Sequence, residues 1–171
     1  MPYPFALVDV FADEPLSGNP LAVVYGGDDL SDDTLARVAR EFNQSETTFV
    51  LAPRSGANRR LRSFTAGGAE VVGAGHNALG AWWWLVHAGH EAPGRLRQEL
   101  GDEVLDLTAE TTGGRISIAM RQGSPVVAGE AAVGEPLAAA LGGTLSGGRA
   151  PVVSTGSPHL LVEAPSGASR V

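Results

Sequence analysis

The fold is decided by residues 73–87, which read GAGHNALGAWWWLVH. Its glycines, followed by His76, form a loop that turns into a helix predicted to run from about Asn77 to Ala88. This helix is apolar on every side and carries three consecutive tryptophans, Trp82 to Trp84. A helix without a polar face has to be buried all round. We therefore expect it to lie at the centre of its domain.

Short strands are predicted on both sides of this helix. Runs of β-branched and aromatic residues between glycine, proline and aspartate are typical of strands. They are expected at Tyr3–Phe11, Leu21–Tyr25, Thr47–Ala52, Arg59–Thr65, Glu70–Val72, Arg95–Leu100, Glu103–Ala109 and Arg115–Met120. This order predicts an α+β fold in which a mostly antiparallel sheet is wrapped round the central apolar helix.

An amphipathic helix is predicted after the second strand. Ser31 has the position of an N-cap, and Asn43 that of a stop. Between them, apolar residues recur at the spacing of one helix face, at Leu35, Val38, Ala39 and Phe42. Such a helix covers one side of a sheet with its apolar stripe.

The last third of the chain is predicted to be a separate, incomplete unit. Residues 122–132 are small and irregular and indicate a linker. A short helix is expected at Pro136–Leu141, and strands at Val152–Thr155 and Leu160–Glu163. We therefore divide the chain into a first lobe, residues 1–122, and a linker with a partial second lobe, residues 123–171.

The composition excludes several kinds of chemistry. The sequence has no cysteine, so it has no disulfide, no thiolate metal site and no thiol nucleophile. All 12 basic residues are arginine, which excludes a Schiff-base lysine and the lysine of a phosphate-binding loop. A net charge of −7 disfavours nucleic acid as a partner.

The chain also has the pattern of a protein that neither crosses a membrane nor is exported. No stretch approaches the roughly 18–20 apolar residues of a membrane span. The first residues lack the basic start of a signal peptide. We expect a cytoplasmic location and no membrane partner.

The glycine-rich loop allows more than one interpretation. Residues 73–78 match the G-x-G-x-x-A form of a dinucleotide fingerprint, in which a helix N-terminus holds the pyrophosphate. That fingerprint opens a βαβ unit, and here several strands without crossover helices come first. The alternative is a glycine-rich helix start chosen for close packing. In every interpretation, free N–H groups face an anion.

Polar residues outside this loop also allow a functional and a structural interpretation. Glu46 precedes an apolar strand, where burial would suit a carboxyl group to proton transfer, although a solvated glutamate is the commoner case. Asn19 is by default a turn residue. His87 and His90 are three positions apart and lack a third ligand, so we expect no metal.

Several segments carry a family resemblance through their order and spacing. They are Val8–Phe11, Ser17–Val24, Ala39–Val50, Phe64-Thr65, Ala74–His76 with Leu79-Gly80, and Val153–Gly156 with Pro158–Leu160. Together they resemble the phenazine-biosynthesis PhzF-like proteins, which have the diaminopimelate-epimerase-like fold. The resemblance covers essentially the whole chain.

The resemblance implies a cofactor-independent isomerase with substrate held between two similar lobes. It implies that Glu46 shuttles a proton and that His76, with Gly75 before it, lies at the central helix start. We expect a protonated or hydrogen-bonding His76 to stabilise the developing enolate. It also implies that Asn19 and Ser45 line the pocket. We add Asn77, because the N–H groups from Gly75 to Asn77 would bind an anionic group.

Three functions follow from these observations. The first is an isomerase lobe that moves a proton on a small carboxylate-bearing metabolite. The second is a truncated, non-catalytic ligand-binding or interaction module of the same fold, and the third is a dinucleotide-binding oxidoreductase. We also expect association, either with a separately encoded C-terminal half or with a second copy.

Overall fold

The structure is a computed structural model of the whole chain. It describes all residues except 1, 74, 123, 141–147, 156–157 and 164–171. The chain divides into two compact units, Met1–Arg121 and Gln122–Val171, which are described separately.

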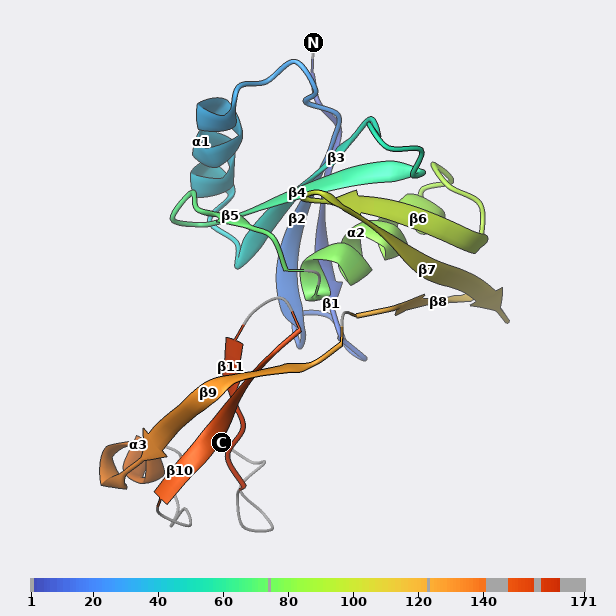
Figure 1. Ribbon diagram of the computed structural model, residues 1–171. Coiled ribbons are helices and arrows are strands. Elements are labelled where there is room, and N and C mark those ends of the chain that lie inside the picture. Colours follow the sequence, from blue (N-terminus) through green and yellow to red (C-terminus); the bar gives the residue numbers. More distant parts are fainter. Residues whose placement is uncertain (1, 74, 123, 141–147, 156–157, 164–171) are drawn as a thin grey trace. The chain divides into compact units, whose positions relative to one another are not determined.

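The first unit is built on one strongly curved mixed sheet (Figure 1). Its strands are β1 Phe5–Val10, β2 Asn19–Tyr25, β3 Glu46–Leu51, β4 Arg59–Thr65, β5 Glu70–Val71, β6 Gly94–Leu100, β7 Glu103–Thr112 and β8 Arg115–Met120. They are ordered β1-β2-β3-β4-β6-β7-β8, and β5 pairs with β4. The pairs β2–β3 and β4–β6 are parallel, and the other pairs in this sheet are antiparallel.

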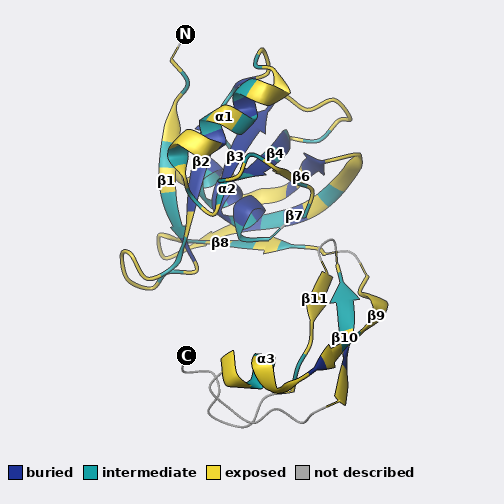
Figure 2. Cartoon of the chain, turned by 90° about the vertical axis from the view of Figure 1, so that its left-hand side faces the viewer, coloured by how far each residue is buried: buried dark blue, intermediate teal, exposed yellow. Residues whose placement is uncertain are grey.

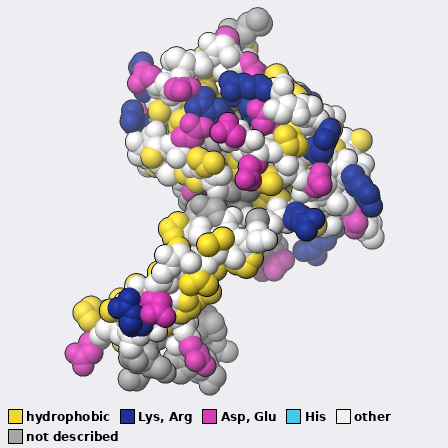
Figure 3. All heavy atoms as spheres, in the orientation of Figure 1, with side chains coloured by type: hydrophobic (Ala, Val, Ile, Leu, Met, Phe, Trp, Pro, Cys, Tyr) yellow, Lys and Arg dark blue, Asp and Glu magenta, His cyan; other side chains and the backbone are white. Residues whose placement is uncertain are grey.

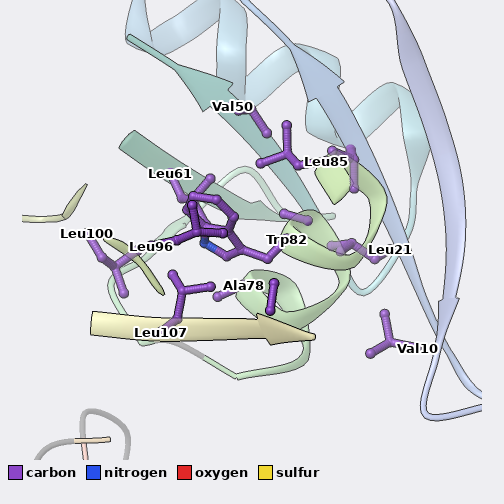
Figure 4. Packing of buried hydrophobic residues seen from close by; sticks show 13 residues of the cluster. Val10, Leu21, Val50, Leu61, Ala78, Trp82, Leu85, Leu96, Leu100 and Leu107 are labelled. Carbon is purple, nitrogen blue, oxygen red and sulfur yellow. The ribbon is translucent and has the colours of Figure 1, made fainter. Parts of the chain in front are cut away.

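Helix α2, His76–His87, packs on the concave face of this sheet, against β1, β2, β3, β7 and β8. Trp82 is fully buried there among aliphatic side chains from the surrounding strands (Figure 4). Gly80 faces Val10 and Leu21, and a Cβ atom at Gly80 would lie 2.6 Å from Val10 Cγ2. The glycine therefore lets α2 approach β1 and β2 closely.

The prediction that this helix is buried all round is wrong in part (Figure 2). Trp83 and Trp84 are only partly buried, and His87 and Ala88 at the end of the predicted helix are exposed. The reason is that the sheet does not close. Strands β1 and β8 are its two edges, and Trp83 lines a groove of about 500 Å³ between them.

Helix α1, Asp32–Phe42, packs on the other face of the sheet. Its predicted caps are confirmed. Ser31 Oγ accepts a hydrogen bond from the Thr34 N–H at 3.3 Å, and Asn43 ends the helix with a left-handed φ of 51°. Leu35 and Ala39 form a second core with phenylalanines of β3 and β4.

The second unit is a small antiparallel sheet in the order β11-β10-β9, with one short helix. The elements are β9 Val126–Val133, α3 Glu135–Ala140, β10 Gly148–Ser154 and β11 Pro158–Leu160. The prediction of a linker over residues 122–132 is wrong, because most of it is β9. Its alanines and glycine carry no alternating apolar pattern, and pairing with β10 makes it a strand.

Strand β10 overlaps the strand expected at Val152–Thr155. The strand expected at Leu160–Glu163 is misplaced, because β11 pairs with β10 over Pro158–Leu160 and ends there. Helix α3 corresponds to the helix expected at 136–141, whose last residue is outside the described residues. The buried apolar residues of the described part are few: Val133 and Ala150, with three partly buried neighbours. The hydrophobic core of this unit is therefore small.

Two properties of the described surface bear on the expected partners. Within those residues, no helix is long and apolar enough to span a lipid bilayer. On the face seen in Figure 3, arginine and acidic side chains are interspersed over the first unit. Arg62, for example, pairs with both Asp32 and Glu70 at 2.6 and 2.7 Å.

Candidate active site

The parallel pairing of β2 and β3 brings two predicted site residues to the same edge of the sheet. Asn19 is the first residue of β2, and Glu46 is the first residue of β3. Glu46 pairs with Leu21 on one side and with Thr65 on the other. Because neighbouring parallel strands begin at the same edge, the two polar side chains lie at one end of the concave face.

Helix α2 begins at this same end and brings His76 to Glu46. The Nε2 atom of His76 lies 2.9 Å from Oε2 of Glu46. The side chains are only 14% and 20% exposed, so both are largely withdrawn from water. Glu46, which is predicted to shuttle the proton, therefore contacts His76 directly.

This contact has an unusual geometry. The distance between the two atoms is that of an ion pair, but they are not aligned as in a directed hydrogen bond. Neither atom therefore makes a hydrogen bond in this contact. Both are inaccessible to solvent, and neither has another hydrogen-bond partner in the described part of the chain. Unsatisfied buried polar atoms are destabilising, and a catalytic role is one established explanation for them.

Asn19 and Ser45 are joined at the rim of this site. The Ser45 hydroxyl donates a hydrogen bond of 2.9 Å to Oδ1 of Asn19. Ser45 immediately precedes Glu46 and is exposed. The structure thus brings four of the predicted residues to one end of the sheet, namely Asn19, Ser45, Glu46 and His76.

The loop that leads to Asn19 is held by Asp9, which the sequence analysis did not single out. The Asp9 carboxylate accepts hydrogen bonds from the N–H groups of Ser17 and Gly18 at 3.0 and 3.1 Å. A Cβ atom at Gly18 would lie 2.4 Å from the carbonyl oxygen of Val10, so only glycine fits there. An aspartate at the end of a strand, followed by a turn rich in glycine and proline, is the sequence signal for such a clamp.

Asn77 is buried and uses its side chain inside the protein. Its Oδ1 accepts a hydrogen bond from the Gly75 N–H at 2.8 Å. Its Nδ2 donates to the Gly73 carbonyl at 3.1 Å and to Ser63 Oγ at 3.0 Å. The side chain is therefore committed to the protein, and only the backbone N–H of Asn77 is left for the expected anion.

The expectation that the Gly75 N–H binds an anion is wrong, because this group donates to Asn77 Oδ1. The helix start itself still has features that favour an anion. Gly75 is the N-cap and provides no side-chain hydrogen bond, and the first turn has no acidic residue. The first N–H groups of a helix have no partner within the helix, and the helix dipole attracts negative charge. Position 74 of the glycine motif lies outside the described residues.

The remaining histidines of the first unit are engaged with aromatic rings at the other end of α2. His87 stacks on Trp83 with ring centroids 4.7 Å apart, and His90 stacks on Tyr25 at 4.4 Å. No group of three metal-ligating side chains occurs in the described part of the chain. The absence of a metal stays a prediction.

The dinucleotide interpretation is not supported by the strand before the glycines. That strand, β5, has two residues and pairs antiparallel with β4. A dinucleotide fingerprint instead follows a strand of a parallel βαβ unit.

Comparisons with curated proteins identify isomerases as relatives. Trans-2,3-dihydro-3-hydroxyanthranilate isomerase from Pseudomonas aeruginosa is 49% identical over 76 residues, which are 44% of this chain and 27% of that protein. An uncharacterized isomerase from Bacillus subtilis is 32% identical over 120 residues, 68% of this chain and 40% of that protein. The chain thus matches well under two thirds of the length of these relatives.

Solved structures show the same similarity along nearly the whole chain. A predicted epimerase from Pseudomonas aeruginosa has a TM-score of 0.79 and 31% identity, covering 98% of this chain and 61% of that one. A PhzF-family protein from Bacillus anthracis has a TM-score of 0.77 and 28% identity, covering 95% of this chain and 56% of that one. The predicted fold class is thereby confirmed.

The family model described as phenazine biosynthesis-like protein matches residues 8–170. This match covers almost the entire sequence and agrees with the structural relatives. The chain therefore belongs to the phenazine biosynthesis-like protein family, as the sequence motifs predicted.

Proposed function

We propose that this chain is the lobe of a cofactor-independent isomerase that carries the proton-transfer residues. The observation that carries the proposal is the contact between Glu46 and His76, 2.9 Å long and withdrawn from water, at the start of α2. General acid–base catalysis needs such a titratable group beside the reacting atoms. The isomerase names of its relatives support the same class of reaction.

The proposed reaction moves one proton between two carbon atoms of the substrate. The Glu46 carboxylate takes a proton from a carbon that is next to a carbonyl group or conjugated with one through a double bond, which leaves an enolate. His76 donates a hydrogen bond to the developing charge. Glu46, now protonated, returns the proton to a second carbon, so the carboxylate is regenerated and no electrons leave the substrate.

The substrate is proposed to be a small carboxylate-bearing metabolite. The N–H groups at the start of α2 would bind its carboxylate, because a helix N-terminus favours an anion. Asn19 and Ser45 would contact its polar groups from the rim. The compound in the name of the Pseudomonas relatives, a dihydro-hydroxyanthranilate, is itself a carboxylate.

The active form is proposed to need more polypeptide than this chain. The solved relatives are longer, and the matched regions cover 56–61% of their chains. A separately encoded C-terminal half would complete the pocket, which would make the protein part of a split enzyme. No cofactor and no metal are part of the proposal.

A non-catalytic module of the same fold is the second candidate. It is favoured by the small core of the second unit, whose described helix has only six residues. Such a chain would bind a carboxylate ligand at the start of α2 without turning it over.

Deuterium exchange tests the proposal. The chain, alone and with a candidate C-terminal half, is incubated in D₂O with dihydro-hydroxyanthranilate and related carboxylates, and incorporation is followed by NMR. Glu46→Gln should lower the exchange rate by about 10²–10⁴-fold, because it removes only the titrating group. Glu41→Gln, on the exposed face of α1, is the matched control and should keep the rate. Equal rates for wild type and Glu46→Gln would exclude the assignment, and ligand binding without exchange would favour the non-catalytic module.

A further inference from the structure

We infer that a buried chain of three side chains, Thr48, Ser63 and Asn77, positions Glu46 and His76 relative to each other. We call it the Thr48–Ser63–Asn77 network. Its catalytic meaning rests on the function proposed above for the pair. The three residues do not reach the reacting atoms and are positioning residues.

The first link of the network joins two strands. Thr48 and Ser63 are directly opposite each other in the pairing of β3 with β4. Their hydroxyl oxygens are 2.8 Å apart, and both side chains are essentially without solvent exposure. Thr48 is two residues after Glu46 and so lies on the same face of β3.

The second link joins the sheet to the loop before His76. Asn77 Nδ2 donates to Ser63 Oγ at 3.0 Å. The same side chain binds the Gly73 carbonyl and the Gly75 N–H, at 3.1 and 2.8 Å. One asparagine thus fixes both ends of the glycine loop to β4, and it is the residue directly after His76.

The contact between Glu46 and His76 cannot by itself hold the loop before His76 in place. Its two atoms are 2.9 Å apart but are not aligned as in a directed hydrogen bond. The residues before His76 include two glycines, which leave the backbone many conformations unless other groups restrict it. The position of the imidazole therefore depends on what holds the loop, and the network is the described set of side-chain hydrogen bonds that does so.

Misplacement of such a pair is costly for catalysis. A shift of about 1 Å in a catalytic group can lower a rate by about 10²-fold. If the network were only structural, its loss would lower the free energy of unfolding. The position of His76 relative to Glu46 would stay unchanged. The two roles therefore predict different results.

Adjacent threonines of β3 provide a matched comparison. Thr48→Val and Ser63→Ala each remove one hydroxyl from the network. Thr47→Val is the control, because Thr47 is equally buried and its Oγ1 has no hydrogen-bond partner among the described residues. Thr48→Ser keeps the hydroxyl and is the rescue variant.

The readout is the imidazole ¹⁵N chemical shift of His76, measured at one pH with and without Glu46→Gln. The change in this chemical shift on Glu46→Gln, called the displacement below, reports how closely the two residues are coupled. Its measurement needs no substrate. We expect it to be the same in wild type, Thr47→Val and Thr48→Ser. In Thr48→Val and Ser63→Ala we expect it to fall to roughly half or less, as for coupled residues in a double-mutant cycle.

Equal displacements in all backgrounds would overturn the inference, and so would the absence of any displacement in wild type. Thermal unfolding shows which variants are folded, and one folded network variant is enough for the comparison. If neither folds, the network is a requirement of the fold, and the inference is again wrong. If the shift changes are as expected but no proton is exchanged, even with an added C-terminal half, the proposed function alone would be refuted.

Discussion

The indole N–H of Trp82 donates a hydrogen bond of 2.8 Å to Oε1 of Gln98, and both side chains are fully buried. Trp82 is in the middle of α2, and Gln98 is on β6. The amide nitrogen of Gln98 in turn contacts the sulfur of Met120 at 3.0 Å. The helix that carries His76 is thus fixed to the sheet by a polar contact inside the apolar core.

Replacement of Trp82 should therefore be among the most destabilising changes in the first unit. Trp82→Ala should lower the free energy of unfolding by about 3–5 kcal/mol, because it leaves a cavity and an unsatisfied Gln98 oxygen. Trp83→Ala is the matched control and should cost clearly less, since Trp83 is partly exposed at the groove between β1 and β8. Urea unfolding followed by far-UV circular dichroism measures both. Equal losses would mean that α2 is not anchored through Trp82.

Asp9 should control the loop that presents Asn19. Asp9→Asn keeps the size of the side chain but replaces one charged acceptor oxygen with an amide group that cannot accept the Ser17 or Gly18 N–H. Hydrogen bonds to a charged group are worth about 1.5–3 kcal/mol, so the free energy of unfolding should fall by about that amount or less. Amide hydrogen exchange at Ser17 and Gly18 should become faster. Unchanged protection of these two amides would contradict the conclusion that Asp9 holds this loop.

The sequence predicts much of the first unit because its signals are local. Ser31 and Asn43 mark the ends of α1, and the apolar run through Trp82 marks α2. Glu46 and His76 could be named from the family motifs. Their contact depends on the parallel register of β2 with β3 and on where α2 begins, which no local pattern contains.

What the sequence does not predict depends on long-range pairing. Ser63 occupies a core position of β4 beside Leu61, and a polar residue at such a position is a signal that it has a buried partner. That partner, Thr48, is defined only by the register of β3 with β4. Strand β9 was missed for a similar reason, because its small residues become a strand through pairing with β10.

Acid should remove the contribution of Arg62 to stability. Hydrogen bonding and charge attraction from Arg62 lower the pKa of Asp32 below its usual 3.8. A carboxyl group whose pKa is lower in the folded state stabilises the fold above its unfolded pKa, and this contribution is lost as pH falls through the folded value. Wild type should therefore be more stable than Arg62→Met at pH 6, and the difference should shrink below about pH 4. The control is Arg37→Met, on the exposed side of α1. A difference that stays constant from pH 6 to pH 2 would exclude this linkage.

Association of the chain is the last prediction. Val126, Val127 and Leu161 of the second unit are each more than half exposed, and its described core is small. Exposed apolar residues on a small three-stranded sheet are a surface that other chains cover. We expect the purified chain to sediment as a dimer or to bind a C-terminal half, at micromolar concentration.

Val127→Glu should weaken this association, because a charge on the exposed strand is poorly tolerated in an apolar interface. Val104→Glu places the same charge on β7 of the first unit and should leave the association unchanged. A monomer with an ordered second unit would contradict the prediction, and proton exchange that appears only with the added half would identify the partner that the active site needs.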